Sequence, residues 1–314
     1  MKKFLIKIGL YAAIVLSFFI VADIVVSKAL RHSDRLEFLA WNNIYNHHWE
    51  PDLVIMGSSR AFVHFNPRIM DSVLHVNSYN LGFNASLVDR QIGRYETFCR
   101  IQNYKPKYIV YSVDYMALNF RDDFEREQFY PYFFYDREMM RTFDKYQHFT
   151  AFEKYVPFAR YCRCFLDFHV YEVFTEPYDY STFYKGFWNE HKEYDASEFA
   201  LVDHLDYSCK DEAWKIFDEY LKKVTDDGIK VIFVYAPLYH ELIPKINGFE
   251  RMYDVYGDLA KKYDIPVLDY TYDELSSDSS YFYNATHLNK VGADIFSRKV
   301  SEDIKNLGII INKE

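Results

Sequence analysis

The sequence predicts an α/β protein with a doubly wound, parallel five-stranded sheet. Five short apolar runs recur along its 314 residues, and most lack the polar alternation of a half-exposed strand. Helical patterns separate several of these runs, and strands alternating with helices are typical of a parallel sheet covered on both faces. Hydrophobic residues make up 50% and charged residues 26%, which is a globular composition.

The predicted elements follow from these apolar runs and from their Gly, Pro and Asp boundaries. Strands are expected at about 53–56, just before 80, at 108–113, 230–235 and 266–269. Helices are expected at 87–99, 211–226, 249–263 and 291–307. Asn289 is a suitable N-cap for the last helix. The period of that helix predicts that Val291, Ile295, Val300 and Ile304 face the core.

The N-terminus predicts a membrane-spanning helix. From Ile8 to Val26 the only charged residue is Asp23, and the length is close to that of a hydrocarbon core. Lysines precede the segment and favour a cytoplasmic N-terminus, but basic residues also follow it, so charge alone orients it weakly. A cleaved signal peptide is the alternative, although the small-x-small cleavage site is poor. We expect residues 1–28 to be a single-pass anchor in the cytoplasmic membrane, with the remaining chain on the extracytoplasmic side.

The remaining chain divides into a linker and one large domain. Residues 29–50 are polar and predict a linker, and residues 51–314 predict the α/β domain. Residues 119–205 break the strand–helix rhythm and predict a helical insertion between the third and fourth strands. This insertion is rich in aromatic side chains, which can stack on sugars or simply form a core. An AT-rich coding sequence would also raise the Tyr and Phe content.

Charge and cysteine content exclude several classes of protein. The formal net charge of −9 argues against a nucleic-acid-binding protein, which needs a basic face. The four cysteines match no zinc-site spacing. We therefore expect no metal, no cofactor and no nucleic-acid partner.

Two short segments carry the candidate chemistry. The tetrapeptide from Gly57 to Arg60 follows the first strand, so its serines are expected at the carboxyl edge of the sheet, where functional residues collect. His287 precedes the last helix and is expected at the same edge. A serine becomes a nucleophile when a base removes its proton, and histidine is the usual base.

These segments resemble the SGNH, or GDSL-type, hydrolase superfamily, whose fold is a flavodoxin-like α/β/α sandwich. The Gly-x-Ser turn after the first strand, the Asn-x-Gly turn after the second and the late His carry the resemblance. The sequence GSSR, the N-terminal anchor and THLNKVGA are more similar to the cell-envelope branch, which includes proteins of exopolysaccharide and teichoic-acid O-acylation.

The resemblance implies a role for each matching position. Ser59 matches the nucleophile, and its N–H is expected to be one oxyanion donor. Gly82 matches the glycine whose N–H is a second donor, and His287 matches the base. Such donors stabilise the charge that develops on the acyl oxygen. Arg60 is expected to bind an anionic group of the substrate, or else to cap a helix or pair with a carboxylate.

Two positions depart from the family pattern. The family places an aspartate three residues before the histidine, where this chain has Asn284, which can orient the imidazole but supplies no negative charge. The third block normally contributes an Asn, where this chain has Asp114, which we place at the substrate-binding edge. Asn84 is expected to supply the missing oxyanion amide, and Asp278 is a further candidate to replace the aspartate.

Together these inferences predict a membrane-anchored serine esterase or O-acyltransferase. The expected substrate is an acyl ester, in particular acetyl, of a cell-envelope or exported polysaccharide. The expected partners are this acylated glycan, the membrane and a membrane-bound acyl donor protein. A protein of the same fold that has lost catalysis and binds glycan or a membrane partner is the alternative, favoured by Asn284 and Asp114. An unrelated flavodoxin-like sheet is the third reading.

Overall fold

The structure is a computed structural model that describes residues 1–119, 126–147, 149–162, 183–189, 191–197 and 204–310. The chain forms two compact units. The N-terminal unit comprises Met1–Asn46 and Asp122–Tyr180, and the sheet unit comprises His47–Arg121 and Ser181–Glu314. Each is described separately below.

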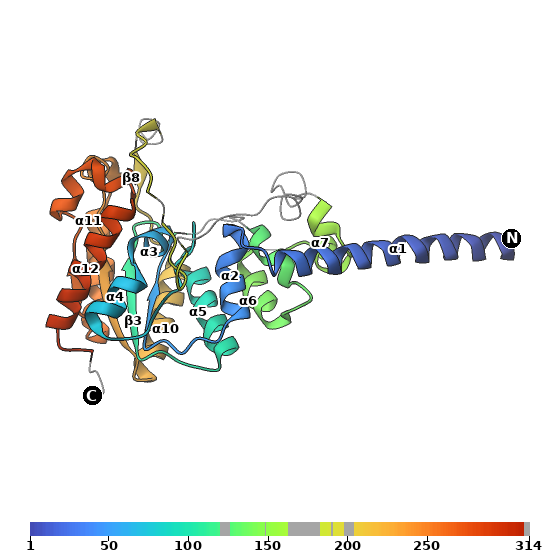
Figure 1. Ribbon diagram of the computed structural model, residues 1–314, viewed down its shortest axis with the longest axis horizontal. Coiled ribbons are helices and arrows are strands. Elements are labelled where there is room, and N and C mark those ends of the chain that lie inside the picture. The colour runs from blue at the N-terminus through green and yellow to red at the C-terminus, as the bar shows by residue number, and fades with distance from the viewer. Residues whose placement is uncertain (120–125, 148, 163–182, 190, 198–203, 311–314) are drawn as a thin grey trace. The chain divides into compact units, whose positions relative to one another are not determined.

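The sheet unit contains the five-stranded parallel sheet that the sequence predicts (Figure 1). Its strands are β1 (Leu53–Met56), β2 (Ser78–Asn80), β3 (Tyr108–Val113), β5 (Lys230–Tyr235) and β7 (Val267–Asp269). Their order is β2-β1-β3-β5-β7, and all four pairings are parallel. Numbered along the sheet's own strands this is 2-1-3-4-5, the flavodoxin-like order of a doubly wound fold.

Helices cover both faces of this sheet because successive strand residues point to opposite sides. The helices of the sheet unit are α3 (Ser59–His64), α4 (Pro67–Leu74), α5 (Val88–Gln102), α10 (Asp211–Asp226), α11 (Glu250–Tyr263) and α12 (Lys290–Asn306). On one face, Ile55, Val110 and Ile232 belong to a buried cluster with α4 and α12. On the other face, the ring of Phe217 in α10 packs 4.7 Å from that of Tyr111.

Short elements complete the sheet unit at its rim. They are β4 (Leu205–Asp206), η3 (Ile243–Lys245), β6 (Ile246–Asn247), η4 (Glu274–Ser277), η5 (Ser279–Tyr281), β8 (Phe282–Asn284) and β9 (His287–Leu288). Strands β8 and β9 pair antiparallel as a small hairpin directly before α12. The hairpin bears on function because it carries His287.

The predicted strands and the helices of the sheet are confirmed to within a few residues, and Asn289 caps α12 by accepting the Gly292 N–H at 3.1 Å. The prediction of the buried face of α12 is partly wrong. Val300 and Ile304 are buried, whereas Val291 and Ile295 are exposed. Ala293 and Phe296 point inward instead and belong to the buried cluster that includes residues of α4.

The N-terminal unit is helical in the residues that the structure describes. It contains α1 (Lys2–Leu30), α2 (Leu36–Asn46), η1 (Arg126–Tyr132), α6 (Arg137–Gln147) and α7 (Ala151–Tyr155). Helix α1 is long and apolar enough to span a membrane, with a mean hydropathy of 2.4 over its best window. Its last turns are anchored in the unit, since Asp23 forms two 2.6 Å contacts with the Arg160 guanidinium.

The prediction of a polar linker over residues 29–50 is wrong. Residues 36–46 form α2, in which Trp41 and Ile44 are fully buried. The Trp41 ring packs against Phe129 and Phe143, and its Nε1 donates to Gln128 Oε1 at 2.8 Å. The many polar residues of this segment led to the prediction of a linker, whereas its apolar residues are buried in a helix of this unit.

The predicted insertion over 119–205 also divides differently. Its first part, Asp122–Tyr180, belongs to the N-terminal unit, and its later part returns to the sheet unit. The described residues 126–147 and 149–155 are largely helical, as expected. The prediction for 120–125, 148, 163–182, 190 and 198–203 falls outside the described residues. In the returning part, the Lys185 carbonyl accepts the Asn80 N–H beside β2.

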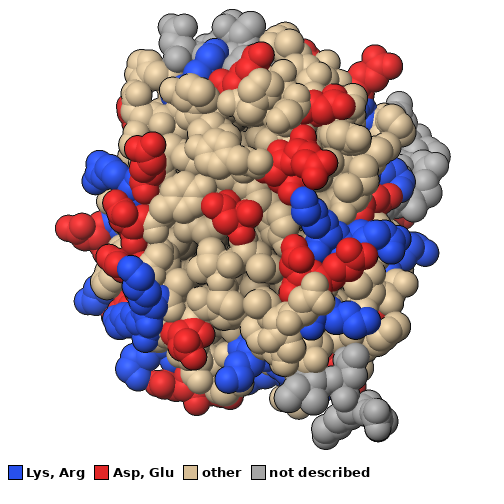
Figure 2. All heavy atoms as spheres, turned by 90° about the vertical axis from the view of Figure 1, so that its left-hand side faces the viewer, with Lys and Arg blue, Asp and Glu red and all other residues tan. Residues whose placement is uncertain are grey.

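Charges of both signs are interspersed over the face drawn in Figure 2. Asp and Glu side chains stand next to Lys and Arg around a largely uncharged centre, and no continuous basic surface forms on this side.

Neighbouring positions of α12 give a matched test of this packing. Phe296 is 0% exposed and Ile295 is 42% exposed. We expect Phe296→Ala to lower the free energy of unfolding by about 3–5 kcal/mol, because it leaves a cavity against α4. Ile295→Ala should cost less than about 1 kcal/mol. Denaturant unfolding of both variants measures this, and a larger loss for Ile295→Ala would contradict the register of α12.

Candidate functional site

The candidate site lies at the carboxyl edge of the sheet, where β1 and β3 end side by side. Here the chain leaves β1 toward one neighbour and β3 toward the other, so a crevice is expected at this switch point. Ser59 follows β1 and Asp114 follows β3. The sequence therefore places polar groups at the position where doubly wound folds bind ligands.

The turn after β1 exposes one serine and buries the other. Gly57 has a φ of 149°, and a Cβ there would lie 2.8 Å from Ala61 Cβ, so only glycine fits. Ser58 is buried and is the N-cap of α3, accepting the Arg60 N–H at 3.4 Å. Ser59 is the first residue of α3 and is half-buried. The strand–turn–helix geometry thus presents the Ser59 hydroxyl at the rim.

His287 lies within hydrogen-bond reach of this hydroxyl. The distance from His287 Nε2 to Ser59 Oγ is 2.7 Å, although the residues are 228 positions apart. The β8–β9 hairpin holds the imidazole, and the ring of Tyr283 stacks on it at 5.3 Å with an interplanar angle of 5°. The structure brings together the serine and the histidine that the sequence singled out.

Asn284 orients the imidazole through its side-chain oxygen. Asn284 Oδ1 accepts the backbone N–H groups of Thr286 and His287 at 3.1 and 3.0 Å, which identifies this atom as the oxygen. The same atom lies 2.9 Å from His287 Nδ1, and Thr286 Oγ1 lies 2.8 Å from it. The Thr286 hydroxyl donates its proton to Asn284 Oδ1 at 3.0 Å, so both oxygens face Nδ1 as acceptors. Acceptors at Nδ1 place the ring proton there and leave the Nε2 lone pair facing Ser59, which is the tautomer that a general base requires.

Burial keeps the imidazole neutral. Burial is the main cause that lowers the pKa of His287 to about 4, and the positive charge of Arg60 lowers it further. The negative charge of Asp114 acts in the opposite direction. At neutral pH the ring is therefore uncharged and can accept the proton of Ser59.

Arg60 and Asp114 lie beneath the site, and their predicted contact with substrate is wrong. Arg60 is 4% exposed, and its guanidinium donates to the carbonyls of Ala236 and Pro237. Asp114 is 5% exposed and accepts the Ser58 hydroxyl at 2.5 Å. The long Arg60 side chain turns under the sheet edge, so both charges support the turn after β1 and do not reach solvent.

The expected oxyanion donors differ in their availability. Ser59 N–H has no hydrogen-bond partner among the described residues, as is usual in the first turn of a helix. The Gly82 N–H donates to Asn80 Oδ1 at 2.8 Å, so the prediction for Gly82 is wrong in this structure. Gly82 is needed for another reason, because a Cβ there would lie 2.4 Å from Phe62 N.

The two remaining predicted residues, Asn84 and Asp278, differ in their hydrogen bonding. The Asn84 side chain is half-buried after β2, and it makes no hydrogen bond within the described part of the chain. Its amide is therefore free to donate to a ligand. Asp278 caps the short helix η5 by accepting the Ser280 N–H, whereas Asn284 occupies the position at His287 Nδ1. Asp278 thus does not replace the missing aspartate.

Sequence reasoning missed residues that hold the two halves of the site together. His64 ends α3, and its Nε2 accepts the Leu288 N–H at 3.0 Å. Asn189 donates its side-chain amide to the carbonyls of Val63 and Leu288. Both tie the helix that carries Ser59 to the strand that carries His287. No local motif signals them, since their partners are backbone groups far away in the sequence.

No protein-family model and no curated protein matches this sequence. Among solved structures, a protein assigned as an acylhydrolase from Bacteroides fragilis is 12% identical over 87% of this chain and 97% of its own, with a TM-score of 0.44. An acetyl xylan esterase, AlAXEase, is 12% identical over 82% and 99%, with a TM-score of 0.42. A lipase/acylhydrolase from Enterococcus faecalis is 10% identical over 83% and 98%, with a TM-score of 0.42. At these values the similarity does not assign the chain to the family of any of these proteins.

The protonation state of His287 can be tested without any substrate. Nitrogen-15 NMR of the imidazole should show a neutral ring with its proton on Nδ1 at pH 6, because the pKa of His287 is lowered to about 4. Protonation should appear only as the pH falls toward that value. Asn284→Asp should raise this pKa, since a carboxylate stabilises the imidazolium. A ring that titrates near the ordinary value of about 6.5 would contradict the burial argument.

Proposed function

We propose that this protein is a serine esterase or acyltransferase of the SGNH type. The observation that carries the proposal is the 2.7 Å contact between Ser59 Oγ and a His287 ring whose other nitrogen faces Asn284 Oδ1. A hydroxyl, a neutral base and a group that orients the base are the parts that nucleophilic acyl transfer requires. They converge at a rim position where Ser59 remains accessible.

The proposed reaction begins when His287 Nε2 removes the Ser59 proton as Oγ attacks the ester carbonyl carbon. The Ser59 N–H and the Asn84 amide stabilise the oxyanion of the tetrahedral intermediate. His287 then returns the proton to the leaving alcohol, and Ser59 carries the acyl group. Water completes hydrolysis, or a sugar hydroxyl completes transfer, after His287 removes its proton.

A membrane anchor at the N-terminus is part of the proposal. Helix α1 is apolar over a sufficient length, and such a helix near the N-terminus is also what a signal sequence provides. The packing of its last turns favours retention, because Asp23 and Ser27 are buried against Arg160 and Tyr161. Cleavage after Asp23 would leave the Arg160 guanidinium without this carboxylate. We place the sheet unit on the extracytoplasmic side of the cytoplasmic membrane.

An acylated polysaccharide of the cell envelope is the substrate class that we propose. Aromatic rings lie beside the catalytic pair, as sugar-binding sites require: Tyr283 stacks on His287, and Trp188 stacks on Phe62 of α3. The GSSR block and the anchor are similar to the O-acylation branch of the family. Acetyl is the acyl group that we propose, and a membrane-bound acyl donor protein would be needed only for transfer.

The second candidate is a protein that binds glycan without turning it over. Asn284 favours it, because the imidazolium formed in the transition state then has no carboxylate in direct contact with it. The negative charge of the buried Asp114 acts on His287, and the positive charge of Arg60 acts in the opposite direction. This candidate predicts carbohydrate binding with negligible esterase activity.

Loss of either catalytic side chain should abolish esterase activity. We expect Ser59→Ala and His287→Ala to lower kcat on an aryl acetate and on acetylated polysaccharides by roughly a thousandfold or more. Ser277→Ala and His204→Ala are matched controls, since both side chains are exposed. Unchanged turnover in both site variants, measured with the full-length protein in detergent, would refute the assignment.

Asn284→Asp distinguishes the enzyme from the binding protein. In an active enzyme, the added charge should raise kcat by roughly tenfold to a hundredfold, because the tautomer is already correct and only charge is gained. In a binding protein, the wild type has only trace esterase activity, and Asn284→Asp should raise it by much more than a hundredfold. A decrease in kcat would contradict the role given to residue 284.

A further inference from the structure

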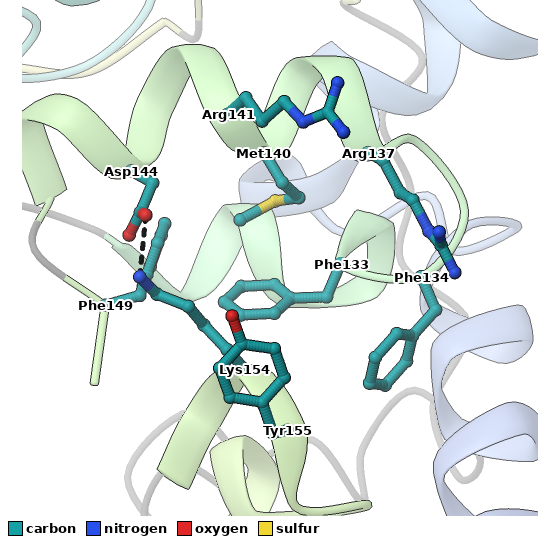
Figure 3. Close-up of a pocket in the computed structure, with 9 residues that line it drawn as sticks. All are labelled: Phe133, Phe134, Arg137, Met140, Arg141, Asp144, Phe149, Lys154 and Tyr155. Atoms are coloured by element: carbon teal, nitrogen blue, oxygen red, sulfur yellow. Dashed lines mark hydrogen bonds and ion pairs between the residues drawn. The ribbon is translucent and has the colours of Figure 1, made fainter. Parts of the chain in front are cut away.

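We propose that a pocket in the N-terminal unit binds the anionic headgroup of a membrane phospholipid. The pocket lies between α6 and α7 and has a volume of about 440 Å³ (Figure 3). Apolar side chains form much of its lining, namely Phe133, Phe134, Met140, Phe149 and Tyr155. Arg137, Arg141 and Lys154 bring positive charge to it. The proposal does not depend on the esterase activity.

The charges at the pocket are not balanced. Lys154 pairs with Asp144 at 2.6 Å, so these two charges offset each other. Arg137 and Arg141 are exposed, and neither forms an ion pair or side-chain hydrogen bond with any residue that the structure describes. They stand four positions apart on α6, where like charges repel. A phosphate oxygen pair between them would relieve this repulsion through charge-assisted hydrogen bonds.

The packing around Arg160 places the pocket at the end of the apolar helix. The Phe134 ring, which lines the pocket, lies 4.8 Å from the guanidinium carbon of Arg160. That guanidinium forms the ion pair with Asp23 of α1. The pocket therefore lies at the level along α1 where burial of the helix begins.

The exposed part of α1 matches the thickness of a bilayer. Residues 4–21 are all exposed, and at 1.5 Å per residue they span about 27 Å, close to the hydrocarbon thickness of about 30 Å. Lys2 and Lys3 then lie at the far interface, and Lys7, one turn inside, reaches the same interface with its long side chain. With residues 4–21 in the hydrocarbon core, Asp23 and the pocket beside it lie at the headgroup level.

Exposed aromatic residues surround the pocket at this level. Phe134 is 54%, Phe152 63% and Tyr155 78% exposed. Near α7, the ring of Phe158 lies 6.2 Å from that of Phe19 in α1, and Figure 1 shows α7 beside α1. Aromatic side chains at the headgroup level are typical of membrane interfaces. The apolar lining together with two unpaired guanidinium groups fits an amphiphile with an anionic head better than a free phosphate ion.

Native mass spectrometry of the full-length protein in a neutral detergent tests the proposal. The protein is titrated with dioleoyl phosphatidylglycerol, with dioleoyl phosphatidylcholine and, separately, with inorganic phosphate. We expect phosphatidylglycerol to bind about tenfold more tightly than phosphatidylcholine. We expect the double variant Arg137→Gln, Arg141→Gln to lose roughly tenfold or more of that affinity.

A matched variant controls for loss of net charge. Lys261→Gln, Arg298→Gln removes two exposed cations from the sheet unit and should leave lipid binding unchanged. The thermal midpoint of each variant checks that folding is retained. Equal phosphatidylglycerol affinity in the wild type and the Arg137/Arg141 variant would overturn the site. Displacement of the lipid by inorganic phosphate at equal concentration would assign the pocket to a free anion and overturn the lipid proposal.

Discussion

The hydrogen bond between Ser59 Oγ and His287 Nε2 is the contact on which the sheet unit depends for any chemistry. It joins segments 228 residues apart, so its length is set by the packing of α3 against the β8–β9 hairpin. His64 and Asn189 fix that packing through backbone groups of Leu288 and Val63. A shift of about 1 Å between the two segments would break the contact, which is why buried polar side chains hold each of them.

Glycine at two positions allows this close approach. Gly57 turns the chain at the end of β1 with a φ that other residues rarely adopt, and Gly82 lets the segment after β2 approach the α3 backbone. The Gly82 N–H donates to Asn80 Oδ1. The effect of the two glycines on function is geometric, because together they place the N-terminus of α3, and hence Ser59 and its free N–H, at the rim of the sheet.

The sequence predicted the sheet and its strands because apolar runs and their Gly, Pro and Asp boundaries are local signals. The roles of Ser59, His287 and Asn284 came from the resemblance of short motifs to a family pattern, and the structure brings these three side chains together. Other features depend on distant partners. The period of the last helix allowed both Ile295 and Phe296 to face inward, and only α4 decides between them. The polar residues around Trp41 concealed a helix whose partners, Phe129 and Phe143, come from the insertion. The Gly82 N–H, expected to be an oxyanion donor, instead donates to the side-chain oxygen of Asn80.

Two buried charges of opposite sign, Arg60 and Asp114, lie beneath the site and act on His287. Burying the Arg60 guanidinium alone would cost free energy of folding. Two backbone carbonyls at the carboxyl edge of the sheet accept hydrogen bonds from it, and the negative charge of Asp114 favours its charged form. Asp114 in turn accepts the Ser58 hydroxyl, so the pair holds the turn that carries Ser59. Burial and the positive charge of Arg60 both disfavour a charged His287 ring, and only Asp114 acts in the opposite direction. Because the Asn284 amide adds no negative charge at Nδ1, an imidazolium formed at this site is stabilised less than it would be beside a carboxylate.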